Sequence, residues 1–175
     1  KSPILMSSVK GETRAKVATN LLRDNGYHNG SVLYQEVPQK NPKESKVNYV
    51  IDMAQPYFLD SIAYLRYPHY ADSLIRSTHS QSVLKSGENF SVLKLEEERQ
   101  RLSSLFRNHG YYYYRPEFTT YRADTLQKPG YVSLQVVPRN GVPTEARKQY
   151  YIGKTSVYLT GYNDELPTDT LRLRT

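Results

Sequence analysis

The 175-residue chain is long enough for one ordinary domain or for two small ones of about 80 residues each. It contains no cysteine, which excludes structural disulfides, thiolate metal sites and a cysteine nucleophile. A formal charge of +7 suits nucleic acid, anionic lipid or an acidic protein, but no window holds the run of five basic residues typical of a nucleic-acid tail.

Tyrosine is the unusual component, with 17 Tyr against 4 Phe and no Trp. Tyr buries its ring while its hydroxyl reaches water or a polar partner, so it suits half-exposed sheet faces and interfaces. No apolar stretch approaches the length of a membrane span, and the first residues show no signal-peptide pattern. We therefore expect a folded, soluble piece of a larger protein with an aromatic surface.

The first part of the chain predicts one helix followed by two strands. Apolar residues between positions 12 and 25 recur at spacings of three and four, as on one helix face: Ala15, Ala18, Leu21 and Leu22. Gly26 ends this helix because glycine adopts the left-handed conformation that closes helices. Residues 31–37 and 46–53 are rich in strand formers, and the loop of about eight residues between them favours an antiparallel pair.

The same order returns in the second half. Residues 95–109 carry a helical apolar stripe, which Gly110 ends: Leu95, Leu102, Leu105 and Phe106. Residues 111–121 and 131–137 then predict two strands. Because proline inside a strand belongs at a sheet edge, Pro116 predicts that residues 111–121 form the outer strand of their sheet.

The two halves form a loose internal repeat. Gly26 and Gly110 are 84 residues apart, and residues 56–59 align with residues 149–152 at an offset of 93. Between the copies, residues 57–67 predict a strand and residues 71–84 a helix. A complete unit, residues 56–148, is therefore strand, helix, helix, strand, strand. Residues 1–55 are a unit incomplete at its N-terminus, and residues 149–175 hold the opening strand of a following unit or a linker.

Two conspicuous runs have structural interpretations. The three glutamates at 96–98 lie early in their helix and Arg101 and Arg107 late, which complements the helix dipole and predicts a solvated face. The four tyrosines at 111–114 could stack on nucleic-acid bases. Alternating placement on a strand, with one set under the helices and the other exposed, is the interpretation we favour.

Nothing in the sequence indicates catalysis. The four histidines show no metal-ligand spacing: His28, His69, His79 and His109. A triad of Asp72, His79 and Ser80 can be drawn, but no Gly-x-Ser-x-Gly elbow and no phosphate-binding glycine loop exists. We expect no enzymatic activity, no cofactor and no small-molecule substrate.

Three segments resemble a known family. They are LEEERQRLSSLFRNHGYYYYRPEF at 95–118, Ala-Asp-Thr at 123–125, and QYYIGKTSVYL at 149–159. They are similar to the POTRA domains of BamA/TamA-like outer-membrane assembly proteins of the surface antigen family. The resemblance implies an α+β fold of tandem POTRA-like modules in the periplasm of a Gram-negative bacterium, tethered through a C-terminal β-barrel that this sequence does not contain.

The resemblance also implies partners. These are outer-membrane protein clients or accessory periplasmic proteins, taken up as an extended segment on a sheet edge by β-augmentation. We expect the middle strand of each unit to present that edge: Val32, Tyr34 and Glu36 in the first, Phe118, Thr120 and Arg122 in the second. The alternative is a basic, tyrosine-rich module that binds nucleic acid or another polyanion, although we do not expect nucleic acid.

Overall fold

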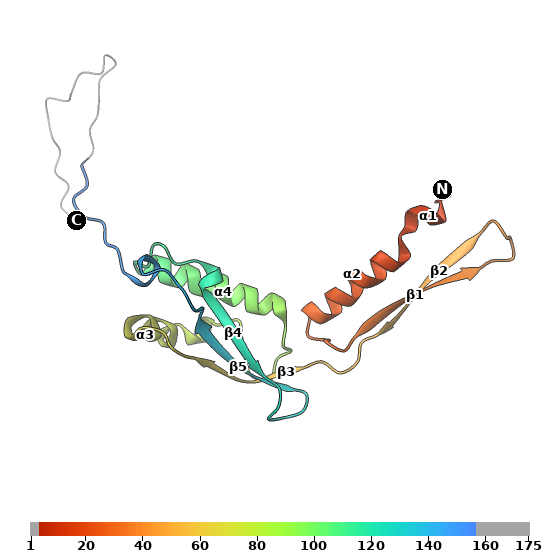
Figure 1. The fold of residues 1–175 in the computed structure, drawn as a ribbon. Helices are drawn as coiled ribbons and strands as arrows, with labels where there is room; N and C mark the ends of the chain where they lie inside the picture. The colour runs from red at the N-terminus through yellow and green to blue at the C-terminus, as the bar shows by residue number, and fades with distance from the viewer. Residues whose placement is uncertain (1–3, 157–175) are drawn as a thin grey trace, which may run out of the picture.

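The computed structural model describes residues 4–156 and arranges them in two units (Figure 1). The first unit contains α1 (Met6–Val9), α2 (Gly11–Asp24), β1 (Ser31–Pro38) and β2 (Ser45–Asp52). The second contains β3 (Phe58–Tyr64), α3 (His69–Ser77), the 3-10 turn η1 (His79–Gln81), α4 (Val92–Asn108), η2 (Pro116–Phe118), β4 (Thr119–Asp124), β5 (Tyr131–Pro138) and η3 (Glu145–Arg147). The predicted α+β class and the order strand, helix, helix, strand, strand are confirmed.

A three-stranded sheet forms the base of the second unit. Its order is β3-β5-β4, with β3 parallel and β4 antiparallel to the central strand β5. Helices α3 and α4 cover one face of this sheet (Figure 1). The core between them is fully buried and combines Leu59 and Leu134 from the sheet with Ile75 from α3 and Leu102 and Phe106 from α4.

The first unit is thinner. β1 and β2 form the predicted antiparallel pair, in which Ser31 lies opposite Asp52, and α2 packs along β1. The described residues contribute no counterpart of β3 to this sheet. Apolar side chains of the first unit consequently stay in contact with solvent; Leu21 and Ile51 are each 60% exposed.

The tyrosine run does not form the strand that the sequence predicted. The Tyr114 amide donates to the Tyr111 carbonyl at 2.9 Å, which closes a turn, and Pro116 then begins the 3-10 turn η2. Tyr111 and Tyr114 are buried while Tyr112 and Tyr113 are exposed, so the faces do not alternate as in a strand. Proline suits the first turn of a helix, where its missing N–H costs nothing. The predicted strand therefore starts only at Thr119.

Two other predicted elements also differ in extent. The helix expected over residues 71–84 ends at Ser77, after which η1 and an extended segment carry the chain to the buried Leu84. Residues 151–156 carry no strand, and the rest of the opening strand predicted after residue 149 lies outside the described residues.

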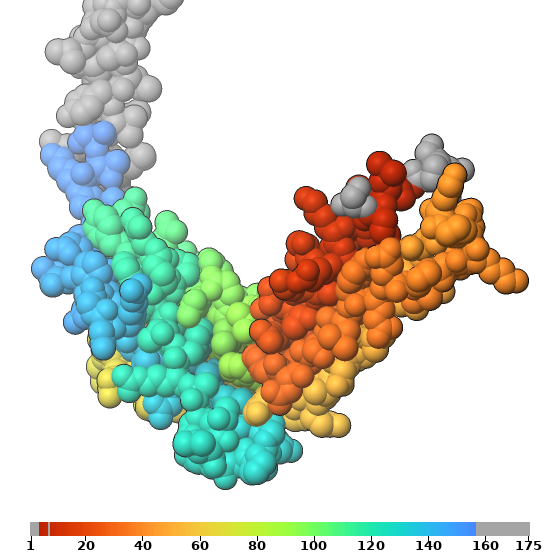
Figure 2. All heavy atoms as spheres, turned by 45° about the vertical axis from the view of Figure 1, so that its right-hand side comes forward, coloured from red at the N-terminus to blue at the C-terminus, as the bar shows by residue number. Residues whose placement is uncertain are grey.

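The two units meet at the end of α2. The Tyr57 amide donates to the Gly26 carbonyl at 3.1 Å, and the Phe90 amide donates to the Tyr57 carbonyl at 2.8 Å. The Ser91 hydroxyl donates to the Asp24 carbonyl at 2.9 Å. From this junction the two units diverge as the arms of a V (Figure 2).

A tight aromatic contact closes the junction. The His28 ring lies 5.9 Å from the Tyr57 ring and 5.3 Å from the Phe90 ring, measured between centroids. Gly26 has φ +97°, and a Cβ built on it would lie 2.6 Å from the Phe90 carbonyl oxygen. Glycine is therefore required here both for the helix-closing conformation and for the close approach of the second unit.

Candidate functional site

The outer strand β4 leaves one side of its backbone unpaired. In its register with β5, Thr119 lies opposite Pro138, and the Arg139 amide donates to the Phe118 carbonyl at 2.7 Å. Hydrogen-bonded and non-hydrogen-bonded pairs alternate along an antiparallel ladder. Counted from Phe118, every second residue of β4 therefore turns its amide and carbonyl toward β5.

The residues in between turn their backbone outward. On the opposite side of β5, the Leu65 amide donates to the Val136 carbonyl at 3.0 Å, which fits the same alternation. Tyr121 and Ala123 pair with no other strand on that outer side within residues 4–156, and their amides and carbonyls accept or donate no hydrogen bond there. The unpaired backbone of the β4 edge is thus centred on these two residues.

The three residues expected from the sequence lie beside this edge in different ways. Phe118 ends the 3-10 turn just before β4, and Thr120 and Arg122 lie within β4 with their backbone groups directed to β5. Thr119 is buried, so alternation places the side chains of Thr120 and Arg122 on the opposite face of the sheet, away from the helices. Sequence reasoning missed Tyr121 and Ala123, because the alternation depends on the register with β5.

Helix α4 holds the edge strand from the inner side. The Tyr121 hydroxyl donates to the Leu95 carbonyl at 2.6 Å, and the Arg99 guanidinium lies 5.1 Å from the centre of the Tyr121 ring. Burial raises the pKa of the Tyr121 phenol above its ordinary value, so this hydroxyl remains a neutral donor. The edge is therefore fixed to the helix while its outward backbone stays unpaired.

The edge of β1 in the first unit is partly occupied. The Gln39 amide donates to the Glu44 carbonyl at 3.1 Å, and alternation from that pair turns the backbone of Val32, Tyr34 and Glu36 away from β2. The Val32 amide, however, donates to the Thr19 hydroxyl of α2 at 3.0 Å.

The Tyr34 ring also lies against α2. A Cβ built on Gly11 would lie 2.0 Å from the Tyr34 ring, so the ring packs directly on the backbone of this helix. The three residues expected from the sequence thus lie together on one edge. Helix α2 covers its beginning and leaves the part around Glu36 more open.

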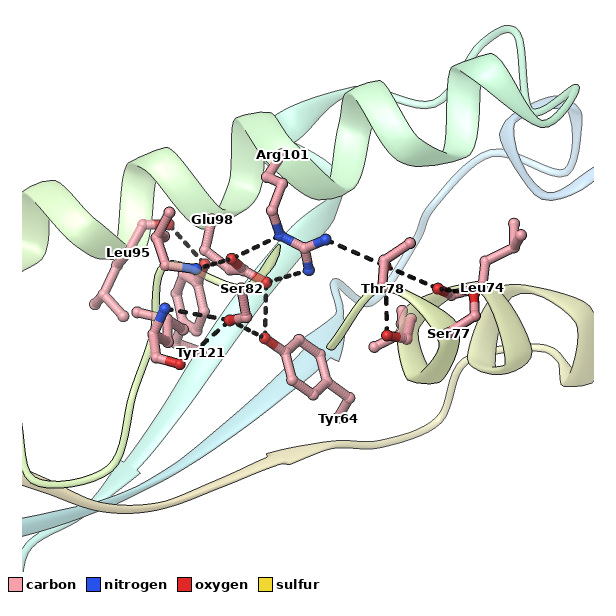
Figure 3. A network of polar contacts seen from close by, with 12 residues as sticks. Tyr64, Leu74, Ser77, Thr78, Ser82, Leu95, Glu98, Arg101 and Tyr121 are labelled. Carbon is pink, nitrogen blue, oxygen red and sulfur yellow. Dashed lines mark hydrogen bonds and ion pairs between the residues drawn. The ribbon is translucent and has the colours of Figure 1, made fainter. Parts of the chain in front are cut away.

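A buried ion pair fixes α4 over the sheet (Figure 3). Glu98 is fully buried, and its carboxylate accepts bonds from Arg101 at 2.6 and 2.9 Å, from the Tyr64 hydroxyl at 2.7 Å and from the Val83 amide at 3.1 Å. Although burial opposes its charge, the bonds and charge of Glu98 hold the pKa of Arg101 above its ordinary value. The expectation of a solvated face at residues 96–98 is therefore wrong for Glu98.

Two other kinds of feature are absent from the described residues. Residues 4–156 contain no group of three His, Asp or Glu side chains placed to hold a metal ion. None of their helices has the length and apolar character needed to cross a bilayer. Within this part of the chain, the unpaired strand edges are one feature that suits the binding of another polypeptide.

The fold and its edges define a class of two-unit α+β protein with unpaired sheet edges. Protein-family models and curated proteins give no match to the chain. Solved structures do. POTRA domains 3–5 of BamA from Haemophilus influenzae match 74% of the chain at 15% identity and a TM-score of 0.43.

Two further structures are similar. BamA from Haemophilus ducreyi lacking POTRA domains 1–3 matches 79% of the chain at 13% identity and a TM-score of 0.48. POTRA domains 1–3 of Omp85 from Anabaena match 74% at 18% identity and a TM-score of 0.39. The chain covers 47%, 24% and 51% of the three proteins, in the order given. The first and third of these neighbours are POTRA domains, as the sequence resemblance predicted.

Proposed function

We propose that this chain is a periplasmic pair of POTRA-type units that binds polypeptides of outer-membrane assembly by adding them as a strand to β4. The observation that carries the proposal is the outward backbone of Tyr121 and Ala123, which pairs with no strand among residues 4–156. An edge of this kind offers main-chain hydrogen bonds to an extended segment without requiring a particular sequence.

The surroundings of the edge support this role. Natural proteins usually blunt an open edge with bulges, prolines or covering segments. Pro116 lies before β4 rather than within it, and the register of β4 with β5 is regular from Thr119 to Asp124. Arg122 is exposed beside the edge. Its positive charge opposes pairing between two copies of this chain and is compatible with the binding of an acidic polypeptide.

The test is a titration of the isotope-labelled chain with a ten-residue peptide of alternating polar and apolar residues, followed by amide chemical shifts. We expect the largest changes at Tyr121 and Ala123, smaller changes in β5, and none in β3 on the far side of the sheet. A peptide that binds without shifting the β4 amides would sink the proposal.

Salt distinguishes this function from binding to a polyanion. Contacts to phosphates release counterions, so their affinity falls steeply between low and moderate ionic strength. Strand addition relies on backbone hydrogen bonds and apolar side chains and depends on salt much less. Binding that disappears at moderate salt would favour the polyanion alternative.

The unit boundaries form part of the same proposal. Residues 56–148 are proposed as a complete unit, because every buried member of its core lies between Leu59 and Val136. A fragment of these residues is expected to give a dispersed amide spectrum. An amide spectrum with the narrow dispersion of an unfolded chain would show that the boundaries of the unit differ from residues 56 and 148.

A further inference from the structure

A cavity of about 290 Å³ lies in the second unit, between the turn that joins β3 to α3 and the segment that follows β5. Its floor consists of aromatic rings. The Phe106 ring lies 4.7 Å from the Tyr114 ring and 5.7 Å from the Tyr67 ring, measured between centroids. The Tyr114 hydroxyl shares a hydrogen bond with the Thr119 hydroxyl at 3.0 Å, so this polar group already has a partner. The floor therefore offers packed rings to a molecule that enters the cavity.

Three arginines line the same cavity: Arg66, Arg139 and Arg147. None of them forms an ion pair with a carboxylate among residues 4–156. No Asp or Glu of the described residues lines the cavity, and the nearby Glu145 lines a separate groove instead. Because arginine stays protonated in proteins, the cavity combines an aromatic floor with three positive charges that have no counter-charge in this part of the chain.

The segment that carries two of these arginines is anchored to the unit. The Arg139 amide donates to the Phe118 carbonyl at 2.7 Å. Further along, Val142 and Ala146 are buried, and Arg147 follows directly after Ala146. The backbone of both arginines is therefore already in place before a ligand arrives, which lowers the entropic cost of binding.

The backbone of Arg66 gives a second, independent indication. Arg66 has φ +65°, a left-handed conformation that residues with a side chain disfavour and that glycine adopts without that cost. Strained backbone positions of this kind cluster at binding and active sites. An arginine in this conformation on the wall of the cavity indicates that its side chain, rather than its backbone, is what the position requires.

A ligand that matches this cavity carries negative charge at one end and an apolar body at the other. Guanidinium groups bind phosphates and carboxylates through paired N–H donors. A phosphate monoester carries about two negative charges at neutral pH, and therefore matches three arginines better than a single carboxylate does. The cavity volume lies at the lower end of the range for small-molecule sites, so the apolar body is no larger than a ring or a short chain.

We propose that the cavity binds a phosphate monoester with a small apolar body. The phosphate lies among Arg66, Arg139 and Arg147, and the apolar body lies on the aromatic floor around Phe106. The site binds this ligand without a chemical step. The inference goes beyond the binding of a polypeptide at β4 and does not depend on it.

The test titrates the whole isotope-labelled chain with phenyl phosphate and follows amide chemical shifts, which give both the location of the site and the affinity. Benzyl alcohol supplies the ring without the charge, and inorganic phosphate supplies the charge without the ring. We expect the largest changes at residues 66–67 and 139–142, and at least about tenfold weaker binding of each comparison compound. Vesicles that contain phosphatidic acid distinguish the two sources of such a phosphate, because only a cavity that accepts a lipid headgroup loses bound phenyl phosphate to them.

Arg66→Gly separates binding from stability. It removes one guanidinium and relieves the left-handed backbone, so the affinity for phenyl phosphate should fall at least about fivefold while the melting temperature does not fall. Arg139→Gln should weaken binding to a similar extent. Arg14→Gln, which removes an exposed arginine of the first unit, is the matched control and should bind normally. Shifts centred elsewhere, a comparison compound that binds as tightly as phenyl phosphate, or unchanged affinity in Arg66→Gly and Arg139→Gln would overturn the proposal.

Discussion

The amide of Tyr150 lies 2.8 Å from the carbonyl oxygen of Gly110 and donates a hydrogen bond to it. The glycine that ends a helix here has two tasks. Its positive φ closes the helix, and in that conformation its carbonyl is presented to the segment that leads out of the unit. At Gly26 the same carbonyl receives Tyr57, so a local stop signal in the sequence also fixes where the next unit attaches.

Gly26→Ala should destabilise the chain more than Gly87→Ala. Both glycines have positive φ, which costs an alanine about 1 kcal/mol. Only Gly26 lies against another backbone, 2.6 Å from the Phe90 oxygen for a built Cβ, and this overlap should cost roughly 1–3 kcal/mol more. Urea unfolding of the two variants measures the difference. Equal losses of stability in the two variants would show that the backbone of the junction moves at little cost to accommodate the added methyl group.

Ala123→Pro should weaken the binding of an extended peptide by at least about tenfold, or about 1.4 kcal/mol. Proline removes an outward amide and obstructs the edge, while the ladder between β4 and β5 keeps its bonds because Ala123 does not contribute to them. Ala123→Ser keeps the amide and should bind normally. Titration calorimetry gives the affinities, and undiminished binding to Ala123→Pro would place the peptide elsewhere.

The same ladder predicts the opposite pattern for Thr120→Pro. Thr120 turns its amide toward β5, so proline there removes a bond within the sheet. We expect a loss of stability of about 3 kcal/mol or more from that substitution, against a small loss for Ala123→Pro. Thermal unfolding of the two variants compares them. Similar melting temperatures would contradict the assignment of outward and inward residues along β4.

Glu98→Gln should lower the free energy of unfolding by about 3 kcal/mol, because it leaves the largely buried Arg101 side chain without its counter-charge. Glu97→Gln, at an exposed neighbouring position, is the matched control and should change stability by less than about 0.5 kcal/mol. Denaturant unfolding measures both. If the two substitutions had equal effects, the ion pair would not be what holds α4 over the sheet.

Local signals in the sequence predicted much of this fold. The ends of the two helices at Gly26 and Gly110 follow from short-range chemistry, as does the hairpin of the first unit. The structure confirms both. The position of β4 at the edge was also predicted, from Pro116, although that proline lies in a turn before the strand.

Other features depend on contacts between distant residues. Which residues of β4 turn outward is fixed by the register with β5, so Tyr121 and Ala123 could not be distinguished from Thr120 and Arg122 beforehand. The burial of Glu98 did have a signal. It lies three residues after Leu95 and four before Leu102, within the apolar stripe of the helix.

The buried tyrosines make stability sensitive to alkaline pH. Burial raises the pKa of Tyr64, Tyr67 and Tyr121 above the ordinary tyrosine value. The folded chain therefore keeps these protons at a pH where the unfolded chain has lost them. The contribution of these phenols to the free energy of unfolding is complete below a pH of about 10 and decreases above it. The decrease is about 1.4 kcal/mol per pH unit for each phenol that is ionised only in the unfolded chain.

Tyr67→Phe isolates one of these phenols. The Tyr67 hydroxyl is buried and makes no hydrogen bond within the described residues, so its removal should cost little stability at pH 8. The same substitution should reduce the loss of stability between pH 9 and 11.5, because one fewer phenol then ionises on unfolding. Tyr113→Phe, which removes a hydroxyl from a ring that is 50% exposed, is the matched control. Urea unfolding followed by circular dichroism across this range measures the slopes, and identical slopes for the two variants would contradict the role of Tyr67.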